Sequence, residues 1–293
     1  MNKGFVFAVA VLMVAIGGCG RPQQQVQKLG SSPALESVSL RDSHIEQALK
    51  AAGGLDKWVK TRQISLNAVV SLYKDDGSFY LTRQHYDVYP WSQAVRIIGG
   101  EPTGRYKWLL RDEDFELSGD VQGQQGSDKS EKRPYVAADL LFGLAPSEFA
   151  QSLLLVMTAP AHLLGRQMNV AAEKADLHRQ PKVVRLQWSG PVKVAGRMYY
   201  RTSLTRTDTA QGKMVSVTGI RRVVFYQNAE TDFLDRIWFV GDGSGTSFAV
   251  WGYDYRELEM SGIYVPSKIN VYKTNLKGIP QEQIVGITIV SEI

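Results

Sequence analysis

Residues 64–73 read Ile-Ser-Leu-Asn-Ala-Val-Val-Ser-Leu-Tyr, and residues 74–78 continue with Lys-Asp-Asp-Gly-Ser. The first run mixes apolar and polar alternation with β-branched residues, which is typical of a half-buried strand. The second run contains the Asp-Gly dipeptide, which favours a tight hairpin turn. Residues 79–88 then return with polar side chains between apolar ones. The stretch therefore predicts an antiparallel β-hairpin.

Short runs of the same kind recur along the chain on both sides of a central apolar region. They lie at 94–98, 106–110, 183–188, 198–204, 221–227, 234–240, 247–255, 263–272 and 284–290. Gly, Asn or Asp separates many of them, and the polar residues 119–133 predict a loop. Regular short strands with such turns favour an antiparallel meander. We therefore expect an α+β protein, mainly β, with one domain at 41–293.

A short helix is expected where this domain begins. Ile45, Ala48 and Leu49 recur at helical spacing, so that they fall on one face. Gly53-Gly54 follows and is expected to end the helix, because glycine readily adopts the left-handed conformation that closes a last turn.

The central region, residues 136–164, has helical rather than strand periodicity. We predict a first segment at 137–142 and a second that begins near Pro146, since proline is tolerated in the first turn of a helix. Pro160 and Gly165 are expected to end the second segment. In this segment one face carries Phe149, Leu153, Val156 and Met157.

Two interpretations of this second segment remain open. Leu154 and Leu155 make its far side apolar too, and a helix that is apolar all round is ordinarily buried in a core. Alternatively, the segment is a lid or plug over a ligand cavity lined by Phe149, Leu153, Val156 and Met157. We favour the lid, because the segment lies between two blocks of strands.

The N-terminal residues resemble a bacterial export signal. Lys3 precedes an uncharged apolar run at 5–16, which is too short to span a bilayer. Ile16-Gly17-Gly18-Cys19 resembles the lipobox of bacterial lipoproteins. We therefore expect a signal peptide at 1–18, lipid on Cys19 and a flexible tether at 19–40. A plain secretory signal with an accidental cysteine is the alternative.

Charge and cysteine content exclude several classes of protein. The net charge is +5, and the Lys and Arg residues form no block of the kind that binds nucleic acid. Cys19 is the single cysteine, so the mature domain has no disulfide and no thiolate metal site.

Catalytic and metal-binding patterns are weak. The histidines, at 44, 85, 162 and 178, show no metal-ligand spacing. Gly243-Ser244-Gly245 lacks the first glycine of a nucleophile elbow. Asp112, Asp114 and Glu116 alternate on an expected strand, either as a cation or acid–base site or, as we favour, as a solvated edge that discourages edge pairing. We expect no enzyme, no metal and no cofactor.

Aromatic residues are abundant in the expected strands. The tryptophans are Trp58, Trp91, Trp108, Trp188, Trp238 and Trp251. They either line an apolar cavity or pack in an ordinary core.

Three short motifs resemble the lipoprotein-carrier superfamily, the LolA/LolB-like domains. They are Ala51-Ala52-Gly53-Gly54-Leu55-x-x-Trp58 with Ile64-Ser65, then Val194-Ala195-Gly196-Arg197-x-Tyr199-Tyr200, and Asp254-Tyr255-Arg256 with Gly262-Ile263-Tyr264-Val265-Pro266-Ser267-Lys268-Ile269. The resemblance implies a curved antiparallel half-barrel, closed by helices, whose concave face holds acyl chains. Within the motifs we expect structural roles, with Gly262 in a turn and Pro266 near a strand edge.

We therefore expect a non-catalytic lipoprotein that binds a lipid or the acyl chain of a lipidated protein. A protein-interaction or envelope-sensor module on the same fold is the alternative, and an envelope enzyme is less favoured. Gly20, rather than Asp, follows Cys19, which by analogy with known sorting rules favours the outer membrane, facing the periplasm.

Overall fold

The computed structural model describes residues 43–101, 104–111, 114–121, 144–175, 183–207, 220–241 and 247–293. Its strands are β1 (Ile64–Tyr73), β2 (Phe79–Tyr89), β3 (Ala94–Glu101), β4 (Gly104–Arg111), β5 (Asp114–Val121), β6 (Val183–Val194), β7 (Arg197–Thr207), β8 (Ile220–Asn228), β9 (Leu234–Gly241), β10 (Phe248–Glu257), β11 (Tyr264–Thr274) and β12 (Pro280–Glu292). The described helices are α1 (Ser43–Ala51), α2 (Leu55–Lys60) and α3 (Pro146–Ala175).

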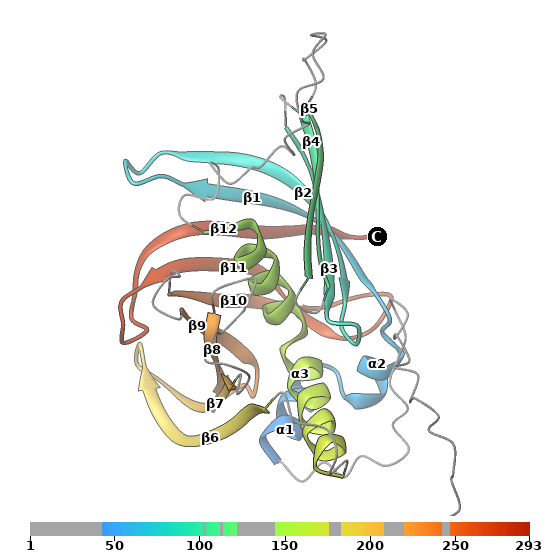
Figure 1. Cartoon of the computed structure of the whole chain (residues 1–293), viewed down its shortest axis with the longest axis vertical. Coiled ribbons are helices and arrows are strands. Elements are labelled where there is room, and N and C mark those ends of the chain that lie inside the picture. The colour runs from blue at the N-terminus through green and yellow to red at the C-terminus, as the bar shows by residue number, and fades with distance from the viewer. Residues whose placement is uncertain are drawn as a thin grey trace, which may run out of the picture.

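All these strands form one curved 12-stranded sheet in the order β5-β4-β3-β2-β1-β12-β11-β10-β9-β8-β7-β6 (Figure 1). Strands that are consecutive in the chain pair as antiparallel neighbours, except β5 and β6, which lie at opposite edges. The pairing of β1 with β12 joins the two halves. The connection from β5 to β6 therefore has to cross the sheet, and it carries α3 over the concave side (Figure 1). The predicted mainly β half-barrel is confirmed.

The hairpin predicted from residues 64–88 and its Asp-Gly turn are confirmed. Tyr73 pairs with Phe79, and Gly77 has a φ of 79°, which its missing Cβ allows. The Ser78 amide donates to Asp76 Oδ1 over 2.8 Å. The Asp side chain thus stabilises the turn that the Asp-Gly dipeptide predicts.

Two of the motifs that carry the LolA-like resemblance meet in space. Gly53, with a φ of 108°, ends α1, and a Cβ there would lie 2.8 Å from the Gly262 carbonyl oxygen. Lys57 Nζ donates to that same oxygen over 2.9 Å. The Gly262 amide closes a turn onto the Leu258 carbonyl oxygen over 2.7 Å. The predicted turn role of Gly262 is confirmed.

The predicted end of the apolar helix is wrong. α3 begins at Pro146, as expected, but continues through Pro160 and Gly165 to Ala175. Pro160 removes one backbone donor and crowds the preceding turn, but the local rule is overridden because the turns on either side of it are buried.

Strand β5 is longer than the sequence suggested. It runs to Val121, so the predicted loop at 119–133 begins inside a strand, and the rest of it lies outside the described residues. Asp114 and Glu116 belong to β5, an edge strand, and the Glu116 side chain is exposed. The predicted helix at 137–142, Asp112 and the predicted segments 1–18 and 19–40 also lie outside the described residues.

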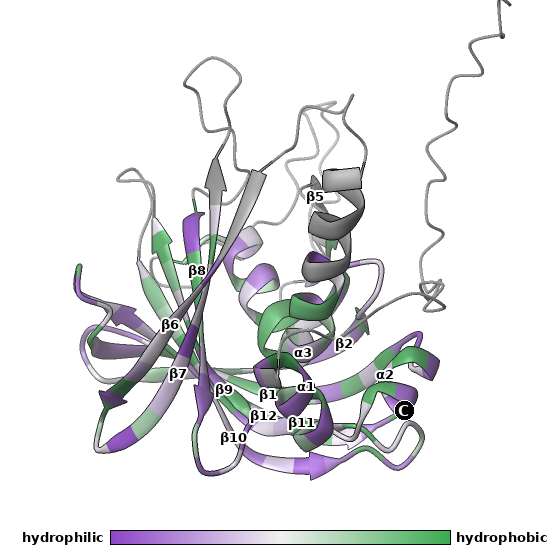
Figure 2. Cartoon of the chain, turned by 90° about the horizontal axis from the view of Figure 1, so that it is seen from below, coloured by the Kyte–Doolittle hydropathy of each residue, from purple (hydrophilic) through white to green (hydrophobic). Residues whose placement is uncertain are grey.

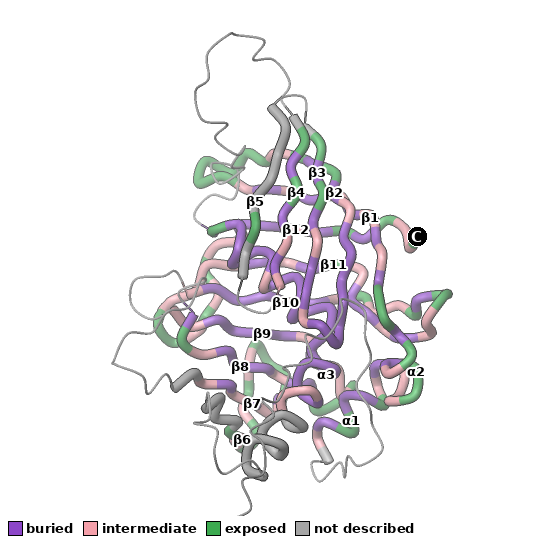
Figure 3. The backbone as a smooth tube through the Cα atoms, turned by 45° about the vertical axis from the view of Figure 1, so that its right-hand side comes forward, coloured by how far each residue is buried: buried purple, intermediate pink, exposed green. Residues whose placement is uncertain are grey.

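The hydrophobic core lies between α3 and the concave face of the sheet. Buried residues run across the central strands (Figure 3), and the described turns of α3 are largely hydrophobic (Figure 2). In β1 every second residue is buried, beginning with Ile64, because alternate side chains of a strand point to opposite faces. The other set of side chains forms the convex outer face.

Candidate functional site

Helix α3 lies across the concave face of the sheet (Figure 1). It contacts β3 and β4 of one half and β9, β10 and β11 of the other. The four residues predicted to line a ligand cavity are almost completely inaccessible, with exposures of 0% for Phe149, 1% for Leu153, 2% for Val156 and 1% for Met157. Leu154 and Leu155 on the far side are buried as well. Between Phe149 and Leu164 the helix is therefore buried on both of its faces.

The apolar side chains of the sheet close tightly on this helix. The Trp108 ring meets Phe149 edge to face, with 6.1 Å between the ring centroids. Three pockets on the outer, convex face of the sheet are lined by described residues of the strands, and no described residue of α3 lines any of the three. α3 therefore lies on the concave face, where the resemblance places an acyl chain.

A small polar cluster lies on the concave face of β2 and β4. Tyr86 Oη donates to Gln84 Oε1 over 2.6 Å, and Gln84 Nε2 donates to Tyr106 Oη over 2.7 Å. Burial, with a smaller contribution from Tyr106, raises the pKa of Tyr86 well above its ordinary value. The cluster thus stays neutral and internally satisfied, so that it adds polarity without charge to an apolar face.

The buried polar groups of α3 bond mostly within the helix segment itself. Ser152 Oγ donates to the Phe149 carbonyl oxygen over 2.7 Å, and Thr158 Oγ1 donates to that of Leu154 over 2.6 Å. Such bonds satisfy the hydroxyl groups without tying the helix to the sheet.

His162 and Glu148 are the buried titratable groups in the described part of α3. The His162 ring stacks on Phe225, with centroids 6.0 Å apart. Burial, with a smaller contribution from Arg166, lowers the pKa of His162 well below its ordinary value. Burial raises the pKa of Glu148, whose carboxylate accepts from the Ala145 amide over 2.8 Å. Both groups are therefore held toward their neutral forms.

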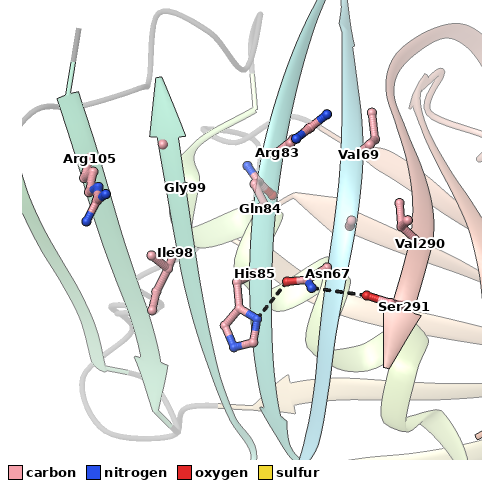
Figure 4. Close-up of a pocket in the computed structure, with 12 residues that line it drawn as sticks. Asn67, Val69, Arg83, Gln84, His85, Ile98, Gly99, Arg105, Val290 and Ser291 are labelled. Atoms are coloured by element: carbon pink, nitrogen blue, oxygen red, sulfur yellow. Dashed lines mark hydrogen bonds between the residues drawn. The ribbon is translucent and has the colours of Figure 1, made fainter. Parts of the chain in front are cut away.

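A groove of about 550 Å³ lies on the outer face of β12, β1, β2, β3 and β4 (Figure 4). Its lining includes Asn67, Val69, Arg83, His85, Ile98, Arg105, Val290 and Ser291. Asn67 Nδ2 donates to Ser291 Oγ over 3.2 Å, and Asn67 Oδ1 lies 3.2 Å from His85 Nδ1. Arg83 and Arg105 add positive charge to a surface with apolar patches.

One carboxylate below this groove is fully paired. Asp87 accepts from Ser65 Oγ over 2.7 Å and from Arg96 Nε over 2.7 Å. Burial acts to raise the pKa of Asp87, but the hydrogen bonds from Ser65 and Arg96 outweigh it and hold the pKa below its usual range. This network neutralises Arg96 and leaves Arg83 and Arg105 as the charged residues of the groove.

The six tryptophans divide between the two faces of the sheet. Trp58, Trp91 and Trp108 are buried in the core and Trp188 packs against it. Trp238 in β9 pairs with Ala249 in β10, and Trp251 in β10 pairs with Arg236 in β9. Both tryptophans occupy the strand positions that face outward. The sequence did not distinguish these two sets.

The described residues contain no group of three His, Cys, Asp or Glu side chains arranged to hold a metal ion. None of the described helices combines the length and apolar character that crossing a membrane requires.

Comparison with known proteins gives similarity at the level of the fold. No family model matches the sequence, and no curated protein sequence matches it. A LolA superfamily protein of solved structure from Nitrosomonas europaea is similar over 87% of this chain and 93% of its own, with 14% sequence identity and a TM-score of 0.50. A DUF1329 family protein from Desulfovibrio piger is similar over 85% of this chain and 90% of its own, with 11% identity and a TM-score of 0.46. The first likeness shows that the chain shares the fold of that LolA superfamily protein.

Sequence reasoning missed the outer groove. Arg83 and His85 alternate with buried residues in β2, and Arg105 alternates with Tyr106 in β4. The period-two pattern therefore showed that these side chains face outward. They form a groove only because the register of the strands places Ile98 beside both His85 and Lys107. Pairing across strands cannot be read from one strand alone.

Proposed function

We propose that the chain is a membrane-anchored, non-catalytic envelope lipoprotein that binds a lipid or the acyl chain of a lipoprotein. The ligand site is the space between α3 and the concave face of the sheet. The placement of α3 carries this proposal, because an apolar helix in the connection between the two sheet edges occupies the concave face. Displacement of α3 would open an apolar groove without breaking any strand pairing.

An exchange of α3 for an acyl chain would cost little free energy. Burial stabilises by about 25 cal/mol for each Å² of apolar surface, whatever group supplies that surface. An acyl chain that replaces Leu153, Val156 and Met157 against the sheet therefore restores most of the burial that is lost. The internal hydrogen bonds of Ser152 and Thr158 move with the helix, so displacement leaves those two hydroxyl groups satisfied.

The test is saturable binding of a fluorescent fatty acyl probe to the full chain. Leu153→Gln places an amide on the inner face of α3 and is expected to weaken binding by about tenfold or more, since a buried amide without a partner costs about 1–3 kcal/mol. Leu81→Gln is the matched control, because Leu81 is exposed on β2 and its change should leave binding as it is.

A second variant guards against loss of folding. Val156→Thr nearly conserves side-chain shape and should weaken binding while the circular dichroism spectrum is retained. Mass spectrometry of lipids co-purified with the unmutated chain would identify the ligand. Absence of saturable probe binding by the unmutated chain, or equal losses in Leu153→Gln and Leu81→Gln, would overturn the proposal.

The anchor is the second part of the proposal. Cys19 is the lipidation site, and the outer membrane, facing the periplasm, is the proposed location. Cys19→Ser should abolish labelling by a palmitate analogue and leave the chain unprocessed or released. Continued labelling of the variant would contradict the lipobox interpretation.

The alternative, a protein-interaction or sensor module, has one observation in its favour. Large apolar side chains are exposed at the hairpin turns joining β1 to β2 and β11 to β12, namely Phe79, Leu81, Leu276 and Ile279. Both turns lie at the same end of the sheet, since β1 pairs with both β2 and β12 (Figure 1). Leu276→Ser should weaken a partner complex and leave acyl-probe binding unchanged.

A further inference from the structure

A second pocket, of about 170 Å³, lies on the outer face of β6, β7, β8 and β9. The strand register aligns its residues in two rows. One row contains Gln187, Ser203, Val224 and Trp238, and the other contains Ser189, Arg201, Tyr226 and Arg236. Arg222 lies two residues before Val224 on the same face of β8 and also lines the pocket. The fold therefore brings arginines from neighbouring strands to one small pocket.

Several donors in this pocket have no acceptor among the described residues. Arg201 Nε, Arg222 Nε and Trp238 Nε1 are buried without a hydrogen-bond partner. Trp238 is only 9% exposed, so its indole N–H cannot be left to bulk water. Buried donors in native structures are nearly always satisfied, and an exception requires an explanation such as an absent ion.

The ring of Trp238 is held in position from two sides. The Arg222 guanidinium carbon lies 5.5 Å from the Trp238 ring centroid. A Cβ at Gly278 would lie 2.7 Å from the ring, so the β11–β12 turn packs directly on the indole. The donor is thus fixed by packing before any ligand arrives, which is the arrangement expected of a preformed site.

In the part of the chain that the structure describes, no carboxylate pairs with the arginines that line the pocket. Among the described residues, Arg201 and Arg222 take part in no ion pair. The third arginine, Arg236, lies over the Trp251 ring at 4.1 Å and has Asp235 at 4.0 Å. Positive charge at Arg201 and Arg222 is therefore available to a ligand.

We infer that this pocket is an oxyanion site for a phosphate group, either inorganic phosphate or the phosphate of a lipid headgroup. Guanidinium groups form paired, charge-assisted hydrogen bonds with phosphate oxygens. Ser189, Tyr226 and the Gln187 side chain supply further donors around them. The Ser203 hydroxyl, also in the lining, donates to the Gln187 carbonyl oxygen over 3.4 Å. The donors exceed the roughly four lone-pair positions of a carboxylate, which favours a tetrahedral anion. This site is on the opposite face of the sheet from α3, so the inference does not rest on the proposed acyl site.

The test titrates the full chain with inorganic phosphate by isothermal calorimetry, and in a second arm with vesicles of phosphatidylglycerol or of phosphatidylcholine. Arg222→Gln and Arg201→Gln should each weaken pocket-dependent binding by about tenfold. Arg221→Gln is the matched control, because Arg221 is the exposed neighbour of Arg222 in β8 and carries the same charge change. Arg222→Lys keeps the charge but loses the planar fork, so we expect an intermediate affinity.

The two arms distinguish the sources of the phosphate. Binding of inorganic phosphate that is lost in Arg222→Gln but kept in Arg221→Gln supports a site for free phosphate. Pocket-dependent binding to phosphatidylglycerol vesicles alone supports a headgroup site. Thermal melts confirm that the variants are folded, and Ser203→Ala, which removes one hydroxyl, provides a milder change. No saturable binding in either arm, or equal losses in Arg221→Gln and Arg222→Gln, would overturn the inference.

Discussion

The two faces of the sheet differ in chemistry although the same strands build both. On the concave face, side chains such as Leu66 and Val70 are wholly buried in the hydrophobic core. On the convex face, the alternate positions hold arginines, aromatic rings and hydroxyl groups that line open pockets. The comparison teaches that stability depends mainly on one set of alternating residues, which leaves the other set available for recognition.

Two neighbouring glycines in β3 show the same difference between a packed and an open face. A Cβ at Gly99 would lie 2.0 Å from the Tyr106 ring, whereas a Cβ at Gly100 would meet no atom within 4 Å. Gly99 faces the packed interior and Gly100 faces the outer groove. Substitutions matched across the two faces therefore test the comparison directly.

Leu153→Ala should have the largest effect. Leu153 is 1% exposed, and the truncation should leave a cavity and cost about 2–5 kcal/mol of the free energy of unfolding. Leu81→Ala on the outer face should change it by less than about 0.5 kcal/mol. Denaturant melts of the two variants measure the difference. A cost below about 1 kcal/mol in Leu153→Ala would mean that α3 packs loosely, as a lid over a partly filled groove.

Gly99→Ala should have the next largest effect. The new methyl group would overlap the Tyr106 ring, which Gln84 holds in place, so we expect a loss of about 1–3 kcal/mol from overpacking. Gly100→Ala should be neutral or slightly stabilising, because alanine restricts the unfolded chain. Equal losses in both variants would show that β3 requires glycine for its backbone rather than for space.

Acid should weaken the packing of α3 through His162. Burial, then Arg166, holds the pKa of His162 well below the ordinary value of 6.5 in the folded chain, so below that pH the unfolded chain binds the proton more readily. The stabilising contribution is thus complete above pH 6.5 and is lost as the pH falls toward the folded pKa. Between pH 7.5 and pH 5.5 the loss is about 1 kcal/mol.

The His162 measurement compares unfolding free energies of the unmutated chain and His162→Gln at both pH values. Burial raises the pKa of Glu148, whose stabilising contribution is lost as pH rises, but Glu148 is present in both proteins and cancels in the difference. A pH dependence that is the same in both proteins would exclude His162 as its source.

The fold was largely predictable from the sequence, because its signals are local. The alternation of apolar and polar residues in 64–73 predicted a strand, and the Asp-Gly dipeptide at 76–77 predicted the hairpin turn that follows it. Both predictions are confirmed. The end of α3 was not predictable, because Pro160 signals a stop locally and only tertiary burial overrides it. The short helix α2 and the far end of β5 were missed for the related reason that their positions depend on neighbouring elements.

The sites were much less predictable than the fold. The burial of Phe149, Leu153, Val156 and Met157 agrees with their common face, but periodicity does not say whether a ligand or the sheet covers that face. The pocket that contains Arg201 and Arg222 depends on the register across β6–β9, which joins residues as distant as Gln187 and Trp238. Such pairing is a property of the assembled sheet rather than of any one segment.

The smallest effect is expected on the outer face, for Arg83→Gln. Arg83 is exposed in the groove of Figure 4, and it takes part in no ion pair among the described residues. Its loss should therefore change the free energy of unfolding by less than about 0.5 kcal/mol.

Arg96→Gln provides the contrast on the same face. It would leave Asp87, which is 2% exposed, without its guanidinium partner, and should cost about 1–3 kcal/mol. Thermal melts at low salt measure both variants. If Arg83→Gln were as costly as Arg96→Gln, the groove would be a structural part of the sheet, and outer-face arginines would no longer be free for recognition. If only Arg96→Gln is costly, the unpaired arginines of the convex face do not stabilise the fold and remain available for recognition of a ligand.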